Sequence, residues 1–325
     1  MGNSTDSIPY SFSSLVRNVK PLLWKICYLR SSPTPDDATV LGHITPLVAR
    51  RLIDSLERTK DHRAREVIGI DTDGKRFLLK DEGTSTEERT RIFRDLLSSW
   101  REDDTFDVLR GWRDEEFPIY GPDHKILLHI ERSATPLFGF VTYGVHMTAY
   151  RRIERDDSES YLFWTPRRSL RKTYPGMLDN TVAGEISSGE KPFETLVREA
   201  MEEAALPEEL VRSRAKAVGM ISYVHVRDVR AGGEVGLIQP ECEYVYDLEV
   251  DEHVIPRPND GEVESFSCLT LNELEKALRR GEFKPNCALV LLDFLIRHGI
   301  LTAENEFDYA EIITRLHRKL EYPVA

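Results

Sequence analysis

The chain has 325 residues, of which 40% are hydrophobic and 31% charged, and its formal net charge at pH 7 is -12. This length accommodates about two domains with cores of their own, while the acidic balance disfavours nucleic acid and anionic membranes as partners. The four cysteines form no Cys-x-x-Cys pair, and no apolar run reaches the ~18 residues of a membrane span. We therefore expect a cytoplasmic protein of two domains that has neither a nucleic acid nor a membrane as its partner.

Residues 1–131 predict a small α+β domain. Apolar residues recur there at helical spacing, and Asp73-Gly74 separates two strand-like runs, which indicates a β-hairpin. The expected elements are helices at 15–29 and 44–56, a hairpin at 66–81, a helix around 92–100 and a strand at 126–131. The aromatic residues within 100–117 lie in a polar stretch, so we expect them to pack at the junction with the next domain or to line a pocket there.

Residues 132–325 predict a second domain that is rich in strands. The long apolar run at 137–153 reads as a buried strand, in which Gly139 and Gly144 mark bends or close backbone approach. Further strands are expected at 161–169, 217–229, 241–250 and 263–271, and helices at 271–280, 288–297 and 309–320. Strands flanked by helices on both sides favour an α/β/α sandwich with a mixed sheet.

The stretch at 184–206 carries the clearest chemical signal. From Pro192 onward its apolar residues recur every three or four positions, which predicts a helix with one side in the core. At roughly 100° per residue, Glu199, Glu202 and Glu203 project from one side of this helix within a turn. Carboxylates so close repel each other, and oxygen ligands suit Mg²⁺ or Mn²⁺. A metal site for a phosphate-containing substrate is therefore predicted; a solvated acidic helix face is the alternative for the three glutamates alone.

The order of fixed residues in this stretch resembles the Nudix box, the signature of hydrolases that cleave diphosphates linked to another group. The matching positions are Gly184, Glu190, Arg198, Glu199, Glu202 and Glu203. The resemblance implies the α/β/α sandwich of the Nudix fold, metal binding by the last three glutamates, and a salt bridge between Arg198 and Glu190 that braces the box loop. Ala205 stands where the box ends in glycine, so the chain must leave the helix there without glycine's freedom.

The similarity continues outside the box, at 138–150, 164–169, 174–190, 259–266 and 283–299. These runs are similar to a Nudix subfamily labelled thiamin pyrophosphokinase-related, whose members carry an extra N-terminal domain of unassigned function. The resemblance implies a diphosphatase that converts oxidised or damaged forms of thiamin diphosphate to their monophosphates. Glu185 departs from the second glycine expected in such relatives, which bears on the loop that meets the diphosphate.

Further residues are candidates for substrate binding. His146 lies in an apolar strand, where it is either a satisfied core residue or a substrate contact. Arg167, Arg168 and Lys172 precede the box in a loop-like stretch; guanidiniums there suit bidentate contacts with diphosphate oxygens, although a solvated basic loop is the alternative.

Two acidic pairs add to the candidate site. Asp179 and Asn180 form either a simple turn or a pair that positions the substrate or the box. Glu262 and Glu264 lie where many Nudix enzymes place a further acid, and we select Glu264 as a candidate base beside Glu203.

We conclude from the sequence that this is a Mg²⁺- or Mn²⁺-dependent diphosphatase of a small molecule, with water as the nucleophile. A broader nucleoside-diphosphate-X hydrolase is the main alternative, because the box specifies the linkage and not the leaving group. A noncatalytic ligand-binding Nudix protein is less favoured, because the box glutamates are intact.

Overall fold

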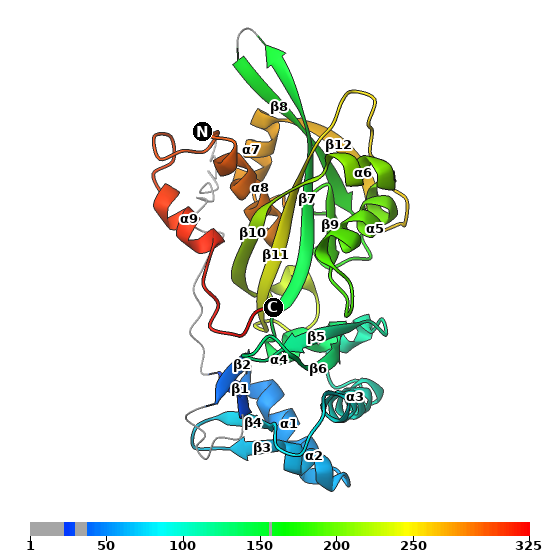
Figure 1. Ribbon diagram of the computed structural model, residues 1–325, viewed down its shortest axis with the longest axis vertical. Helices are drawn as coiled ribbons and strands as arrows, with labels where there is room; N and C mark the ends of the chain where they lie inside the picture. The colour runs from blue at the N-terminus through cyan, green and yellow to red at the C-terminus, as the bar shows by residue number, and fades with distance from the viewer. Residues whose placement is uncertain (1–22, 30–37, 156–157) are drawn as a thin grey trace, which may run out of the picture.

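The computed structural model describes residues 23–29, 38–155 and 158–325. Its helices and strands form two units stacked along the long axis of the molecule, with the N-terminal unit at the bottom in Figure 1. In the described part of the chain, no helix is both long and apolar enough to cross a membrane.

The N-terminal unit is built on a four-stranded sheet. Its strands are β1 (Trp24–Leu29), β2 (Thr39–Ile44), β3 (Ile68–Asp71) and β4 (Arg76–Lys80), in the order β2-β1-β4-β3. β1 runs parallel to β4, and the other two pairings are antiparallel, which confirms the predicted hairpin of β3 and β4. The helix predicted at 15–29 is wrong for Trp24–Leu29, because pairing on both edges holds that segment as a central strand; the earlier part lies outside the described residues.

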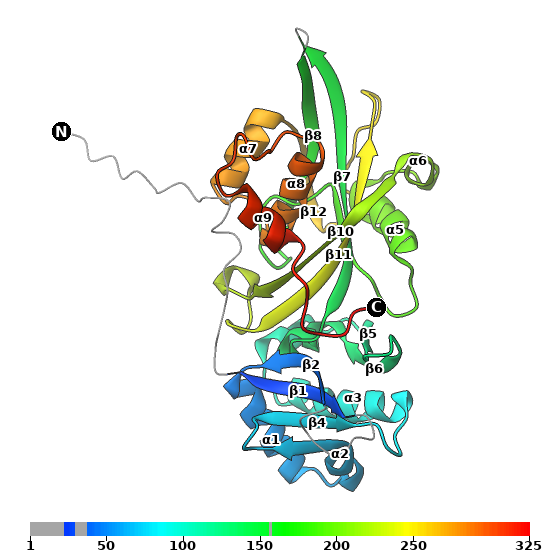
Figure 2. The same ribbon diagram turned by 60° about the vertical axis from the view of Figure 1, so that its left-hand side comes forward.

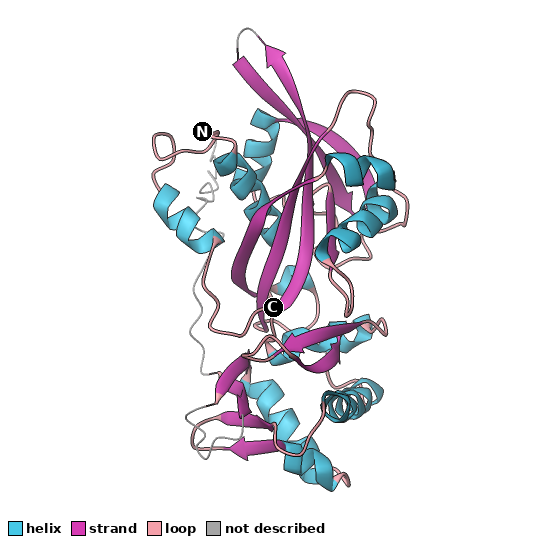
Figure 3. Cartoon of the chain, in the orientation of Figure 1, coloured by secondary structure: helices cyan, strands magenta, loops and turns pink. Residues whose placement is uncertain are grey.

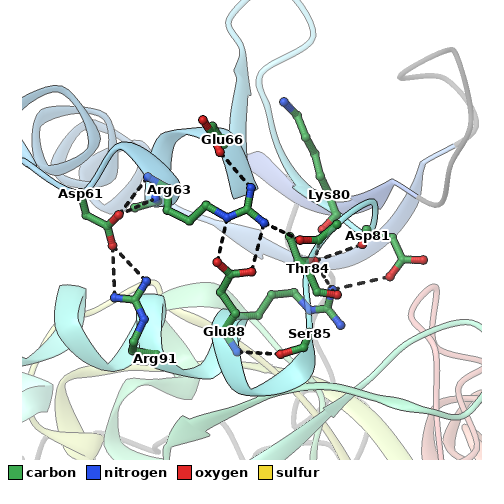
Figure 4. Close-up of polar contacts among 12 residues, drawn as sticks. Asp61, Arg63, Glu66, Lys80, Asp81, Thr84, Ser85, Glu88 and Arg91 are labelled. Carbon is green, nitrogen blue, oxygen red and sulfur yellow. Dashed lines mark hydrogen bonds and ion pairs between the residues drawn. The ribbon is translucent and has the colours of Figure 1, made fainter.

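Three helices cover this sheet: α1 (Pro46–Arg58), α2 (His62–Val67) and α3 (Thr86–Glu102). The helices predicted at 44–56 and around 92–100 are thus confirmed, and Ser85 caps α3 by accepting a hydrogen bond from the backbone N–H of Glu88 at 3.2 Å. Figure 4 shows the polar network that joins α2 to α3, in which Arg63 Nε donates to Glu88 Oε1 at 2.8 Å. Arg63 and Glu88 are partly exposed, so their ion pair contributes little to the free energy of unfolding and acts mainly on the orientation of the two helices.

A β-hairpin of β5 (Glu116–Tyr120) and β6 (Ile126–Glu131) follows and lies between the two units in both views (Figures 1 and 2). The chain then forms the short helix α4 (Thr135–Phe138), which ends at Gly139 in the left-handed region, with φ at 62°. A Cβ at Gly139 would lie 2.3 Å from the carbonyl oxygen of His43, so this close approach requires glycine. The strand predicted from residue 137 therefore begins only at Thr142.

The second unit contains a six-stranded mixed sheet. The strands are β7 (Thr142–Arg155), β8 (Ser158–Arg168), β9 (Val182–Glu185), β10 (Lys216–Val226), β11 (Ile238–Glu249) and β12 (Val263–Thr270). The order is β10-β11-β7-β8-β12, with β9 paired to β7, and only β11 and β7 run parallel. β7 and β8 continue beyond the helices as a hairpin (Figure 3).

Helices lie on both faces of this sheet (Figure 2). One face carries α5 (Pro192–Ala204) and α6 (Glu208–Arg214); the other carries α7 (Leu271–Arg279), α8 (Pro285–Arg297) and α9 (Tyr309–Leu316). Each face has its own apolar core. The predicted fold, an α/β/α sandwich with a smaller α+β domain before it, is confirmed. Residues 134–140 pack into the N-terminal core, and the boundary after residue 131 stays a prediction.

Candidate active site

Two adjoining cavities, of about 590 and 280 Å³, form a cleft between the β5–β6 hairpin and the second sheet. Residues from both units line both cavities: Arg113, Arg132, Lys172, Ala183, Gly184 and Glu185. The smaller cavity is bounded by the helix α5, while the larger one extends over the strands β7 and β11. A ligand in this cleft would therefore touch the predicted box and the N-terminal unit together.

Gly184 allows the box helix to pack tightly against β9. A Cβ at this position would lie 2.2 Å from Cγ of Glu199, so only glycine admits the Glu199 side chain there. Burial raises the pKa of Glu199 to about 8, helped by the charges of Glu203 and Glu202 and opposed by Arg198. Glu199 is thus a carboxylate whose ionised form is poorly compensated, and a cation beside it would stabilise that form.

Glu203 lies deeper, with 4% of the residue exposed. One carboxylate oxygen accepts a hydrogen bond from the backbone N–H of Ala183 at 2.9 Å, and the other accepts one from Lys172 Nζ at 3.0 Å. Burial raises the pKa of Glu203 even though Lys172 lowers it. The position of Glu203 is therefore fixed between the strand β9 and a lysine at the edge of the cleft.

The predicted brace between Arg198 and Glu190 is present. Arg198 donates from Nε and Nη2 to the two oxygens of Glu190, both at 3.0 Å, in the bidentate geometry that suits a guanidinium. Its Nη1 also donates to Glu199 Oε1 and Glu202 Oε2, each at 2.9 Å. Arg198 therefore ties the box loop to the helix and offsets part of the acidic charge.

Metal binding by Glu199, Glu202 and Glu203 remains a proposal. Among the described residues, no three His, Cys, Asp or Glu side chains converge as a ready metal-ligand group, because Arg198 and Lys172 hold the glutamates apart in separate ion pairs. The chemistry of the donors still fits a hard divalent cation: three carboxylates within one helical turn, beside a glycine that leaves room.

The helix α5 ends on Ala205, which adopts the left-handed region with φ at 51°. Its backbone N–H bonds to the carbonyl of Met201 at 3.1 Å, and that of Leu206 bonds to Ala200 at 3.0 Å, so the last turn is closed as a glycine would close it. The conformation costs an alanine ~1 kcal/mol or more. The absence of glycine at the end of the box therefore leaves the path of the chain unchanged.

We expect Arg198→Ala to lower the melting temperature by about 2–4 °C, because the Glu190 carboxylate loses its bidentate partner. Glu202→Ala is the matched control, since it removes only one of the contacts of Arg198 from a largely exposed side chain, and it should leave the melting temperature unchanged. Thermal unfolding of both variants checks this. Equal and negligible shifts would contradict a bracing role for Arg198.

The basic residues before the box point in different directions. Arg168 is buried and forms an ion pair with Asp179, while its Nε donates to the carbonyl of Thr173 at 2.9 Å. Lys172 reaches the acidic side of the cleft, where it contacts Glu203 and Glu262. Arg167 is exposed, donates to the carbonyl of Gly176 at 2.6 Å and lies outside both cavities. Arg167 and Arg168 project from opposite faces of the strand, and substrate binding by Arg167 stays a prediction that its exposed position does not support.

His146 lines the larger cavity and is almost fully buried. Its Nδ1 lies 2.8 Å from Asn180 Oδ1, and its Nε2 lies 3.6 Å from Glu243 Oε2. Burial disfavours the charged ring, but the carboxylate of Glu243 and the contact with Cys287 raise its pKa well above the usual value. Neither Asn180 nor Asp179 lines a cavity. Asn180 contacts His146 and Asp179 pairs with Arg168, so these two residues orient side chains that do line the larger cavity.

The position of Glu264 gives no support to its predicted role as the base, which stays a prediction. The pairing of β12 with β8 slips between Val263 and Ser265, and this bulge leaves the Glu264 side chain exposed and outside both cavities. Glu262 lines the smaller cavity instead, where Lys172 and Arg113 contact its carboxylate. Glu262 is therefore the member of the Glu262 and Glu264 pair that lies near the box.

Sequence reasoning missed an acidic group, Glu241 and Glu243, in the lining of the larger cavity. Tyr223 O–H contacts Glu241 and also Glu243, the latter at 3.0 Å. One hydroxyl proton cannot serve two ionised carboxylates, and burial together with Glu243 raises the pKa of Glu241 to about 8. The available signal was the spacing of Glu241 and Glu243 two residues apart in a predicted strand, which places both on one face of the sheet. Arg113 and Arg132, from the N-terminal unit, were missed as well.

A carboxylate-bearing helix that faces basic side chains across a cleft is suited to a ligand with phosphate groups. Comparison with known proteins agrees. Residues 40–142 match the domain of unknown function DUF4743, and residues 145–287 match the NUDIX domain. An uncharacterized protein of Saccharomyces cerevisiae is 35% identical over 323 residues, covering 98% of this chain and 90% of that protein.

Two further relatives are Nudix hydrolase 20 and Nudix hydrolase 24 of Arabidopsis thaliana, both named as chloroplastic. Each is 35% identical to this chain. The match to Nudix hydrolase 20 covers 72% of this chain and 59% of that protein, and the match to Nudix hydrolase 24 covers 64% of this chain and 54% of that protein. Among solved structures, the protein DR0079 of Deinococcus radiodurans aligns with a TM-score of 0.37 at 20% identity, covering 63% of this chain and all of that one. An Ap4A hydrolase of C. elegans aligns with a TM-score of 0.32 at 14% identity, and the alignment covers 48% of this chain and 98% of that one. The chain therefore contains a Nudix domain that follows a DUF4743 domain.

Proposed function

We propose that this protein is a metal-dependent diphosphatase that cleaves the P–O–P bond of a small organic diphosphate, releasing a monophosphate and phosphate. The observation that carries this proposal is the placement of Glu199 and Glu202 in the lining of a cleft that also contains Lys172, whose Nζ donates to the buried Glu203. The smaller cavity would hold the diphosphate and the larger one the organic group.

In the proposed reaction, water attacks phosphorus, the P–O–P bond breaks, and the proton of the water passes to a carboxylate. Glu199, Glu202 and Glu203 would hold Mg²⁺ or Mn²⁺, which when bound supplies charge neutralisation and lowers the pKa of water. Glu203 and Glu262 lie on either side of Lys172 and are the candidate proton acceptors. Lys172, released from one of them, would contact a diphosphate oxygen as a mobile point charge.

We propose a thiamin diphosphate analogue, such as an oxidised or damaged form, as the substrate. The resemblance to the thiamin pyrophosphokinase-related subfamily supports this, and so does the lining of the larger cavity. That lining combines the rings of Tyr174 and Phe117 with the carboxyl groups of Glu241 and Glu243, which suits an amino-substituted heterocycle. Glu243 Oε2 is buried, lies 3.6 Å from His146 Nε2 and accepts no hydrogen bond within the described chain, so it retains the capacity to accept one from an N–H donor.

The test is a substrate screen of the purified protein with Mg²⁺. Thiamin diphosphate and its oxo forms are compared with ADP-ribose, NADH and nucleotide sugars by kcat/KM. Preference for the thiamin-type compounds supports the proposed substrate, whereas preference for ADP-ribose or NADH favours the nucleoside-diphosphate-X alternative. Binding of any of these without cleavage would favour a noncatalytic Nudix protein. The cytoplasmic location stays a prediction, since two plant relatives are named as chloroplastic.

We expect Glu243→Gln to lower kcat/KM for the preferred thiamin-type substrate by about tenfold or more, because a hydrogen-bonded carboxylate would be lost from the pocket of the organic group. Cleavage of a diphosphate with a small, uncharged organic group should change little. Glu249→Gln, on the same strand but outside the cavities, is the matched control. A uniform decrease for all substrates would show that Glu243 does not select the organic group.

A further inference from the structure

The N-terminal unit is bound directly to the box loop through the β5–β6 hairpin. The backbone N–H of Ser188 donates to the carbonyl of Glu116 at 3.0 Å, and the hydroxyl of Ser187 donates to the carboxylate of Glu115. Ser188 Oγ also lies 2.8 Å from Nδ1 of His129, on the second strand of the hairpin. The loop that carries Glu190 is therefore held in place by residues of the domain whose function is unassigned.

Arg132, at the end of this hairpin, projects into the cleft. Its Nη1 donates to Glu115 Oε2 at 3.0 Å, and its guanidinium lies 5.8 Å from the ring centre of Phe117. Within the described residues, Glu115 is the one side chain to which it donates, although a guanidinium offers five N–H groups. The side chain is 32% accessible and lines both cavities, so its remaining donors face the cleft.

Arg113 precedes the first strand of the hairpin, and because the strands are antiparallel it lies at the same open end as Arg132. Its backbone N–H donates to Glu131 Oε1 at 3.1 Å, which holds the main chain in place. Its guanidinium reaches across to the Nudix domain, with Nη1 3.5 Å from Glu262 Oε1, and 49% of the side chain is accessible. This single long contact leaves the guanidinium free to turn toward a better acceptor in the cleft.

We propose that the N-terminal domain completes the diphosphate site: Arg132 and Arg113 bind the diphosphate oxygens that face away from the box helix. This inference rests on the proposed function. A diphosphate carries at least two negative charges and meets several carboxylates on the box side, among them Glu185 and Glu199. The two arginines are basic groups from outside the Nudix domain that line both cavities, and planar guanidiniums bind such oxygens in pairs.

The test measures binding and turnover in the full-length protein. The probe is methylenediphosphonate, an analogue of diphosphate whose P–C–P linkage cannot be hydrolysed, titrated by calorimetry with Mg²⁺ present. We expect Arg132→Gln and Arg113→Gln each to raise its Kd, and KM for the substrate, at least about tenfold. Arg132→Lys should recover only part of the affinity, because an ammonium lacks the planar pair of donors. Arg94→Gln is the matched control: Arg94 pairs with Glu116 of the same hairpin but lies outside the cavities, and no change is expected.

A purely structural role would give a different pattern. If Arg132 only secures the hairpin, Arg132→Gln and Glu115→Gln will lower the melting temperature alike while Kd and KM stay at their wild-type values, and this result would overturn the proposal. Arg113→Gln decides the matter if Arg132→Gln fails to fold, since Arg113 is half exposed. Failure of the proposed function looks different again: the wild-type protein would cleave no diphosphate, whatever the variants do to probe binding.

Discussion

Glu199→Gln and Glu203→Gln are each expected to lower turnover by at least about 10²-fold at saturating Mg²⁺. Glutamine keeps the shape of glutamate but removes the negative charge, so it would weaken metal binding and leave the diphosphate charge uncompensated. The fold should persist. Burial raises the pKa of both carboxyl groups, which means that the protein holds their charge at a cost and loses no stability when a neutral amide replaces it.

The matched control for these variants is Glu194→Gln on the same helix. Glu194 is paired with Arg212 on the outer side of α5 and lies outside both cavities. Its turnover and melting temperature should equal those of the wild type. Wild-type turnover in Glu199→Gln or Glu203→Gln at saturating Mg²⁺ would remove that residue from the proposed metal site, and a large loss of melting temperature would point to a packing role instead.

The local features of the site followed from the sequence because they depend on short-range periodicity. The apolar spacing after Pro192 gave α5 and most of its core face, although Met201 is exposed and Glu203 is buried. Glu190 and Arg198 meet across the loop as the resemblance implied. Ala205 shows that a local rule can be broken at modest cost, since the helix ends in a left-handed turn without glycine.

Features that depend on pairing between distant segments were harder to predict. Glu262 and Glu264 are equivalent by composition, and only the bulge opposite Arg168 decides which one faces the cleft. Likewise, Trp24–Leu29 has a helix-compatible pattern, but its place between β2 and β4 makes it a strand. Arg113 and Arg132 carry no motif in the sequence. Their importance arises from the docking of one domain on the other, which periodicity does not encode.

The second large effect concerns stability. Asp179→Asn is expected to lower the free energy of unfolding by about 3 kcal/mol, because it leaves the guanidinium of Arg168 buried beside a neutral amide. The estimate is at the low end for a broken buried ion pair, since Arg168 keeps its hydrogen bond to the carbonyl of Thr173. Denaturant unfolding near pH 7 measures the difference. Asp251→Asn is the control, because its pair with Arg214 is largely exposed and no measurable change is expected.

The dependence on pH separates this ion pair from simple packing. Burial favours the neutral acid, but the charges of Arg168, Lys284 and Lys172 outweigh it and hold the pKa of Asp179 well below its usual range. A carboxyl group whose pKa is lower in the folded state binds its proton more readily when unfolded. Its stabilisation is therefore complete above the unfolded pKa of about 3.9 and is lost as the pH falls toward the folded value. The gap in stability between the wild type and Asp179→Asn should be constant from pH 7 to pH 5 and should shrink below about pH 4. A gap of the same size at pH 3 would mean that Asp179 contributes by shape and hydrogen bonding, with its charge of no consequence.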